Sequence, residues 1–213
     1  MSMAPARRVR PRQSAPKALG PGAAGIRLTP AEFDRADFEE DHCYELINGV
    51  LVVSPIPLES EVDPNEELGY WLRHYRNNHP QGSALDMTLP ERHVFVGPNR
   101  RRADRLIWAG HGRLPRRTAP PTIIAEFVSK GKRDQQRDYE EKRDEYLAID
   151  VREYWVIDRF RRTMTVFQMV KGEISQRVVT EKQTYTTPLL PGFELPLAKL
   201  LRVADRWAEV QDA

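Results

Sequence analysis

Short apolar runs separated by polar turns recur along most of the chain, a pattern typical of a domain rich in β-strands. Two β-prone runs, 44–47 and 50–53, are joined by Asn48-Gly49, which is a strong hairpin signal. The run 153–157 is apolar on both faces, which favours a central strand covered on both sides. Further strands are expected at 83–89, 93–96, 104–108, 122–128, 163–169 and 173–179.

Three segments have helical periodicity instead. Thr29-Pro30-Ala31-Glu32 matches a capping box with proline at the first helical position, which predicts a helix to about Glu40. A second helix is expected over 65–77, where one stripe carries Leu68, Trp71, Leu72 and Tyr75. A charged helix is expected over 133–148.

The order of these elements predicts a single α/β domain of mixed α+β type over 26–204. A strand, a helix and a second buried strand between 122 and 157 form one crossover unit. The segment 188–201 is expected to pack across the sheet, and 205–213 to be a frayed tail. Residues 1–25 combine five basic residues and no acid with Pro, Ala and Gly, which predicts a disordered basic arm.

Composition limits the class of protein. With 213 residues, 40% hydrophobic and 30% charged, the chain has the make-up of a globular domain. No stretch approaches the ~20 apolar residues that cross a bilayer, and the start lacks a secretory signal, so no membrane partner and a cytoplasmic location are expected. The single Cys43 cannot form an internal disulfide. The net charge of +2 does not by itself indicate nucleic acid, although 100–102 and 113–117 are locally basic.

Two carboxylates on predicted strands carry most of the functional information. Asp104 opens one apolar run and Glu126 lies inside another. A carboxylate buried in a strand is costly unless it is paired or binds a cation. Beyond Glu126 the strand runs on by ~13 Å, and nine residues of the returning helix cover about the same distance, which brings Lys142 level with Glu126.

The helical stripe of Tyr139, Lys142 and Tyr146 turns the lysine towards the sheet. Two carboxylates suit Mg²⁺ or Mn²⁺, and a nearby lysine could orient water or neutralise charge during phosphodiester hydrolysis. Alternatively, Lys142 only snorkels out or pairs structurally with Glu126. Glu45 is a candidate third catalytic acid, or else a rim carboxylate on an exposed hairpin face.

Several motifs together resemble the Uma family, a bacterial family of restriction-endonuclease-like domains in the PD-(D/E)XK nuclease superfamily. They are 44–49, Arg102-Ala103-Asp104, 124–129, Asp138 with Lys142 and Tyr146, 151–158 and 190–193. The resemblance covers about residues 29–201. It implies a restriction-endonuclease-like mixed β-sheet flanked by helices, with added β-hairpins, and metal-binding acids at Asp104 and Glu126.

The chain departs from the family pattern at two places. Ala103 replaces the proline before the aspartate, and Val128 occupies the place of the lysine two residues after the glutamate. The resemblance implies that Lys142 replaces that lysine, since relatives carry a lysine at this helix position. The segment 54–64 also lacks an expected histidine.

These observations predict a Mg²⁺- or Mn²⁺-dependent endonuclease acting on DNA, with Asp104 and Glu126 as metal ligands and Lys142 and Glu45 as further catalytic groups. A homodimer would suit symmetric cutting of a duplex. The alternative is a catalytically inactive nucleic-acid-binding or protein-interaction module that retains the nuclease fold. The five histidines show no metal-ligand spacing, and Trp155, Tyr154 and Phe127 are expected in the core.

Overall fold

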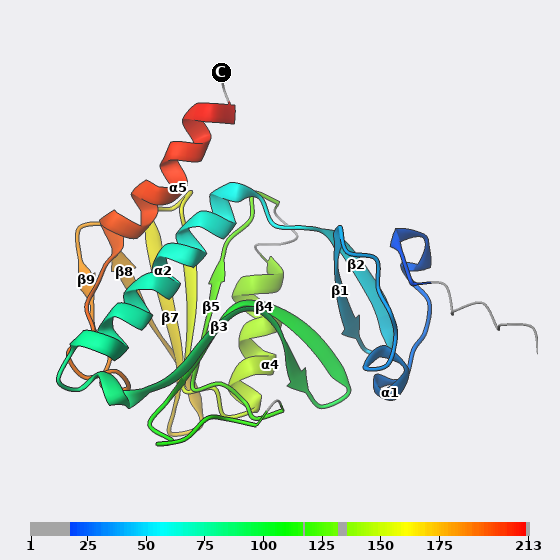
Figure 1. Cartoon of the computed structure of the whole chain (residues 1–213), viewed down its shortest axis with the longest axis horizontal. Helices are drawn as coiled ribbons and strands as arrows, with labels where there is room; N and C mark the ends of the chain where they lie inside the picture. Colours follow the sequence, from blue (N-terminus) through cyan, green and yellow to red (C-terminus); the bar gives the residue numbers. More distant parts are fainter. Residues whose placement is uncertain (1–17, 117, 132–135, 212–213) are drawn as a thin grey trace, which may run out of the picture.

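The computed structural model describes residues 18–116, 118–131 and 136–211, and eight strands in these ranges form one sheet (Figure 1). The sheet order is β2-β1-β4-β5-β6-β7-β8, with β3 paired to β4. Every pairing is antiparallel except that of β5 with β6. The strands are β1 (His42–Ile47), β2 (Val50–Pro55), β3 (Leu85–Val96), β4 (Asn99–Ala109), β5 (Ile123–Phe127), β6 (Glu153–Asp158), β7 (Thr163–Val170) and β8 (Glu173–Thr180).

Helices cover both faces of this sheet, which confirms the predicted mixed α+β architecture (Figure 1). A two-stranded sheet of β9 (Thr184–Tyr185) and β10 (Leu195–Pro196) lies beside it. The helical segments are η1 (Pro21–Ala23), α1 (Pro30–Phe33), α2 (Glu59–Asn78), η2 (Gly82–Ala84), the π-helical turn η3 (Arg137–Glu141), α4 (Lys142–Ala148) and α5 (Leu197–Gln211). None of the helices in the described ranges is long and apolar enough to span a membrane.

Successive side chains of β5 point to opposite faces of the sheet, so this strand contributes to the core on both faces. Ile123 and Ala125 are buried in a cluster with residues of α2 and α5, whereas Ile124 is buried with Tyr146 and Leu147 of α4. The expected core residues Tyr154, Trp155 and Phe127 are all buried. A polar side chain on the α4 face of this strand must therefore find its partners on α4 or on a neighbouring strand.

The first predicted hairpin is confirmed, and the first helix is shorter than predicted. Asn48 and Gly49 both adopt positive φ between β1 and β2, as a tight hairpin turn requires. The Thr29 capping box forms, but α1 ends at Phe33 instead of about Glu40. Beyond it, Asp34 pairs with Arg100 at 2.8 Å and Phe38 stacks on Tyr44, so tertiary contacts draw the chain out of the helix.

Order also begins earlier than the predicted residue 26. Leu19 bridges to Phe38, and the amide N–H of Gly25 donates to the carbonyl of Leu51, so 18–25 pack on the first hairpin. The prediction of disorder is therefore wrong for residues 18–25, and residues 1–17 lie outside the described chain.

Two other boundaries differ from expectation. Helix α2 starts at Glu59 rather than 65 and contains Pro64. This proline is in the second turn, and the side chain of Glu61 accepts the N–H of Leu58 at the helix start. The strands expected at 83–89 and 93–96 are one strand, β3, which continues through Pro90 and a positive φ at Glu91.

The crossover from β5 to β6 and the C-terminal packing follow the prediction. β5 and β6 pair in parallel, and η3 and α4 lie between them; the predicted helix start at 133 falls outside the described residues. Leu190, Phe193 and Leu197 of the C-terminal segment are buried against the sheet. The chain then stays helical to Gln211, where we expected a frayed tail from 205.

Candidate active site

Asp104 and Glu126 lie where strands β4 and β5 separate. The last paired residues are Arg105 and Ala125, and the same register places Asp104 beside Glu126. Beyond that point a side chain replaces the strand partner, because Asp104 Oδ2 accepts the backbone N–H of Phe127 at 2.7 Å. Both acids line one cleft, so they face the same side of the sheet.

Lys142 meets Glu126 as the helix length predicted. Its Nζ donates to Glu126 Oε1 at 2.9 Å, and both side chains are almost fully buried. The Tyr146 hydroxyl, one turn further along α4, donates to the same oxygen at 3.2 Å. The lysine therefore does not snorkel to solvent, and its charge is held against the strand carboxylate.

Two more groups fix the lysine from the other side. Nζ donates to the carbonyl oxygen of Arg102 at 3.1 Å and lies 3.5 Å from Asp138 Oδ1. Asp138 is buried, and sequence reasoning gave it no catalytic role. Its position four residues before Lys142, on the same helical stripe, was the available signal.

Burial sets the electrostatics of the two acids. Desolvation raises the pKa of Glu126 to about 7, even though the Lys142 charge opposes the shift. Desolvation, followed by repulsion from Glu126, raises the pKa of Asp104 well above its ordinary value. Burial alone would lower the pKa of Lys142, but Glu126 and Asp138 outweigh it, so the net shift is upward. The lysine therefore remains an ammonium group.

Glu45 joins the first hairpin to this site. Its Oε1 accepts the backbone N–H of Arg102 at 2.8 Å, and it lines the same cleft as Asp104. The side chain is only 5% exposed, so the alternative of a rim carboxylate on an exposed hairpin face is wrong. All four predicted site residues are thus brought together.

The cleft is large enough for part of a polymer. It has a volume of about 360 Å³ and lies between the β1–β2 hairpin, the start of α2 and the loop after β5. Cations as well as acids line it: Arg102, Lys130, Arg137 and Lys142. A polyanion could enter it only if these cations, or bound metal, offset the carboxylates.

The donor set fits a hard cation with several water ligands. Within the described residues no three His, Cys, Asp or Glu side chains gather as a metal site, so a closed tetrahedral zinc site is not offered. The described hydrogen bonds of the two acids fall on Asp104 Oδ2 and Glu126 Oε1. Asp104 Oδ1 and Glu126 Oε2 are therefore the atoms open to an ion such as Mg²⁺, which keeps several waters.

Other residues considered from sequence have structural roles. His93 is held by the carbonyl of Tyr44 at 2.8 Å, and Cys43 is buried with a pKa raised by that burial. Asp158 accepts the N–H groups of Phe160 and Arg161, so it caps the turn after β6. Val128 is buried in the apolar cluster under α4, so this strand position supplies no cation to the site.

Comparison with known proteins supports the same fold. A sequence profile of the Uma2 family, described as "Putative restriction endonuclease", matches residues 30–198. The structure is similar to the crystal structure of a "putative nuclease belonging to DUF820" from Anabaena variabilis, with a TM-score of 0.67 and 15% identity. That similarity covers 83% of this chain and 99% of the other. Among curated protein sequences, none matches the chain.

Proposed function

The chain belongs to the Uma2 family of restriction-endonuclease-like proteins, and we propose that it is a metal-dependent endonuclease that hydrolyses phosphodiester bonds in DNA. The observation that carries the proposal is the contact of Lys142 Nζ with Glu126 at 2.9 Å in a cleft that also holds Asp104. A buried glutamate and lysine beside a half-buried aspartate are costly to the fold, and phosphodiester hydrolysis would explain why they are placed there.

Asp104 and Glu126 are the residues that would hold Mg²⁺ or Mn²⁺. When bound, such an ion supplies a more acidic water and stabilises negative charge on the phosphate. Asp104 is held in place by the N–H of Phe127, and Glu126 by Lys142 and Tyr146, so neither carboxylate has to move to reach the cleft. This pre-organisation is what a phosphoryl-transfer site requires.

Lys142 acts through its charge in this proposal. Its pKa is raised, so it keeps its proton and cannot serve as the base that activates water. It can donate a hydrogen bond to the attacking water or to a phosphate oxygen, and it offsets the charge that develops during the reaction. Both roles predicted from sequence, water orientation and charge stabilisation, are compatible with a lysine that stays protonated.

Cleavage of plasmid DNA with Mg²⁺ or Mn²⁺ tests the proposal. We expect the wild type to cut, and Glu126→Gln to lose at least ~100-fold in rate, since Gln cannot replace a charged ligand. Glu173→Gln, which removes an exposed acid of β8, is the matched control and should retain full activity. Equal inactivity of wild type and Glu126→Gln with both metals would contradict the nuclease proposal.

Two further measurements, of DNA binding and of oligomeric state, address the alternative function and the assembly. Salt-sensitive DNA binding without cleavage, unaffected by Glu126→Gln, would favour an inactive nucleic-acid-binding module. A homodimer is part of our proposal because two clefts related by a two-fold axis can address both strands of a duplex. Light scattering of the protein with and without duplex DNA measures that state.

A further inference from the structure

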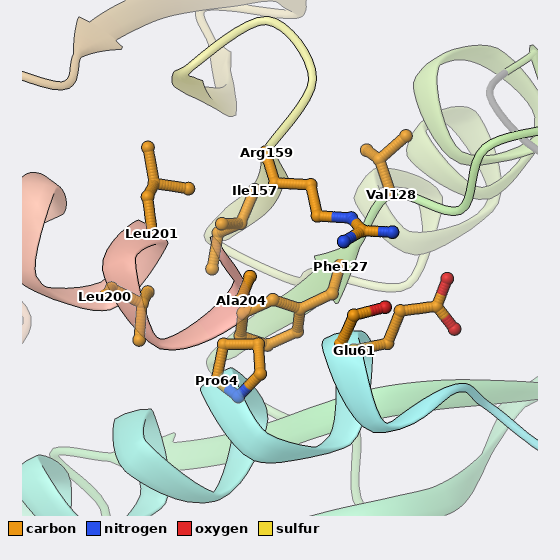
Figure 2. Close-up of a pocket in the computed structure, with 10 residues that line it drawn as sticks. Glu61, Pro64, Phe127, Val128, Ile157, Arg159, Leu200, Leu201 and Ala204 are labelled. Carbon is orange, nitrogen blue, oxygen red and sulfur yellow. The ribbon is translucent and has the colours of Figure 1, made fainter. Parts of the chain in front are cut away.

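Arg159, which has no ion pair with any residue that the structure describes, lies next to the cleft. Arg159 follows directly after β6, and it lines a small pocket whose other walls come from α2, β5 and α5 (Figure 2). The pocket encloses only about 10 Å³, room for no more than one water, so it is not itself a ligand site. Glu61 and Phe127 line both this pocket and the cleft, which places Arg159 at their shared wall.

The surroundings of Arg159 leave part of its guanidinium unsatisfied. Its Nε atom is buried and has no hydrogen-bond partner in the described chain. The guanidinium packs over the ring of Phe160 at 4.6 Å, and in Figure 2 it extends past Phe127 towards Val128 and Glu61. An arginine cannot lose its proton, so an unpaired, partly buried guanidinium favours an anionic partner.

Four arginines of β4, three of them buried and Arg102 half-buried, have such partners. Each of four has a carboxylate at 3.0 Å or less, in the pairs Arg100–Asp34, Arg101–Glu145, Arg102–Glu91 and Arg105–Glu66. Glu61 could have played this part for Arg159, but its carboxylate accepts the N–H of Leu58 at 3.2 Å, and no ion pair joins the two in the described residues. Within 18–116, 118–131 and 136–211, no carboxylate therefore pairs with Arg159.

Topology brings a second cation to the same edge. β5 and β6 are parallel, with Phe127 opposite Ile157, so the segments that follow them emerge side by side. Lys130 follows β5, is exposed and lines the cleft, and Arg159 follows β6. Ligands bind preferentially at the carboxyl ends of parallel strands, and Arg is well suited to grip phosphate with two hydrogen bonds.

We propose that Arg159 and Lys130 hold a phosphate of the DNA backbone next to the phosphodiester that Asp104 and Glu126 address. The proposal rests on the proposed function for the identity of the polyanion. These two residues are positioning residues: they contact the substrate backbone and set the register of the strand over the acids, and they take no part in bond breaking.

DNA binding by proteins that cannot cut provides the test. In a Glu126→Gln background without metal, duplex affinity is measured over a series of KCl concentrations. We expect Arg159→Gln and Lys130→Gln each to weaken binding and to flatten the slope of log K against log salt by about 0.9, one phosphate contact. Arg159→Lys should keep the slope. Arg177→Gln, which removes an exposed arginine of β8, is the matched control and should change neither affinity nor slope.

Each outcome decides the proposal. An unchanged slope in both Gln variants, or no duplex binding by the parent protein, overturns it. If Arg159→Gln melts at a much lower temperature than its parent, its binding data are set aside. The slopes of Lys130→Gln, which changes an exposed residue, and of Arg159→Lys then decide the proposal. Failure of the phosphate site can be distinguished from failure of the nuclease proposal. If the wild type cuts DNA but the variants have unchanged salt slopes, only the phosphate site is refuted. If the variants have altered salt slopes but the wild type does not cut DNA, only the nuclease proposal is refuted.

Discussion

Glu126 makes the fold itself sensitive to pH. Its pKa is raised by burial from 4.5 to about 7, so the folded protein holds a proton that the unfolded chain has released. Between these two pH values the folded state binds more protons, and stability must therefore fall as the pH rises through this window. Asp104, whose pKa is also raised by burial, contributes with the same sign.

We accordingly predict that metal-free protein is less stable at about pH 8 than at about pH 5, with the Glu126 contribution of the order of 3 kcal/mol. Glu126→Gln should remove most of the slope, because Gln does not titrate. Urea unfolding across this pH range measures it, with Glu173→Gln as the control that keeps the slope. A stability that rises with pH in the wild type and equally in Glu126→Gln would contradict the assignment.

The Lys142–Glu126 pair can be tested as structure and as catalyst at once. Lys142→Met leaves Glu126 buried without its cation, which should cost about 3–5 kcal/mol. The double variant Lys142→Met/Glu126→Gln removes both charges, and it should regain much of that loss. Denaturant unfolding of the four members of the cycle measures the coupling.

Activity of the same four proteins separates the two roles. If the pair serves catalysis, the double variant is folded yet does not cleave DNA. Recovery of both stability and cleavage in the double variant would show that the ion pair is only structural, as the alternative from sequence allowed.

At the scale of elements, the β1–β2 hairpin is connected to Lys142 through the backbone of Arg102. Glu45 of β1 accepts the N–H of Arg102, and the carbonyl of Arg102 accepts from Lys142. We predict that Glu45→Gln, which keeps an acceptor oxygen, leaves cleavage within a few-fold of wild type. Glu45→Ala should lower it by about 10-fold or more through displacement of Lys142. Initial cleavage rates at saturating metal measure both, and loss of activity in a well-folded Glu45→Gln would instead make the Glu45 charge essential.

Local signals fixed the elements that depend on few residues. The hairpin at Asn48-Gly49 and the capping box at Thr29 were predictable because each rests on backbone geometry that those residues favour by themselves. The meeting of Lys142 with Glu126 was predictable as well, since strand and helix rises determine where the chain returns.

Tertiary contacts decided the rest. The end of α1 at Phe33 depends on the pairing of Asp34 with Arg100, a residue of β4 far away in the sequence. β3 continues through Pro90 because β4 pairs with it on both sides of that residue. The role of Asp138 was hidden for the same reason: only the folded site shows that it shares the ammonium of Lys142 with Glu126.

At the scale of the whole molecule, the sheet separates a structural end from a reactive edge. α2 and α5 cover one face of the sheet with apolar contacts (Figure 1). The cleft lies between the first hairpin, the start of α2 and the loop after β5. At this edge Asp104 and Glu126 repel each other. Binding of a divalent cation there should relieve that repulsion and so stabilise the entire domain.

We therefore predict that Mg²⁺ raises the melting temperature of the wild type. Saturation to 100 times the dissociation constant is worth about 2.7 kcal/mol, which corresponds to roughly 5–10 °C in a domain of this size. Asp104→Asn and Glu126→Gln should abolish the shift, and the Glu173→Gln control should retain it. Differential scanning calorimetry over a Mg²⁺ series measures the effect, with KCl matched for ionic strength. An equal shift in all four proteins would place the ion elsewhere, because only binding between the two cleft carboxylates depends on both of them.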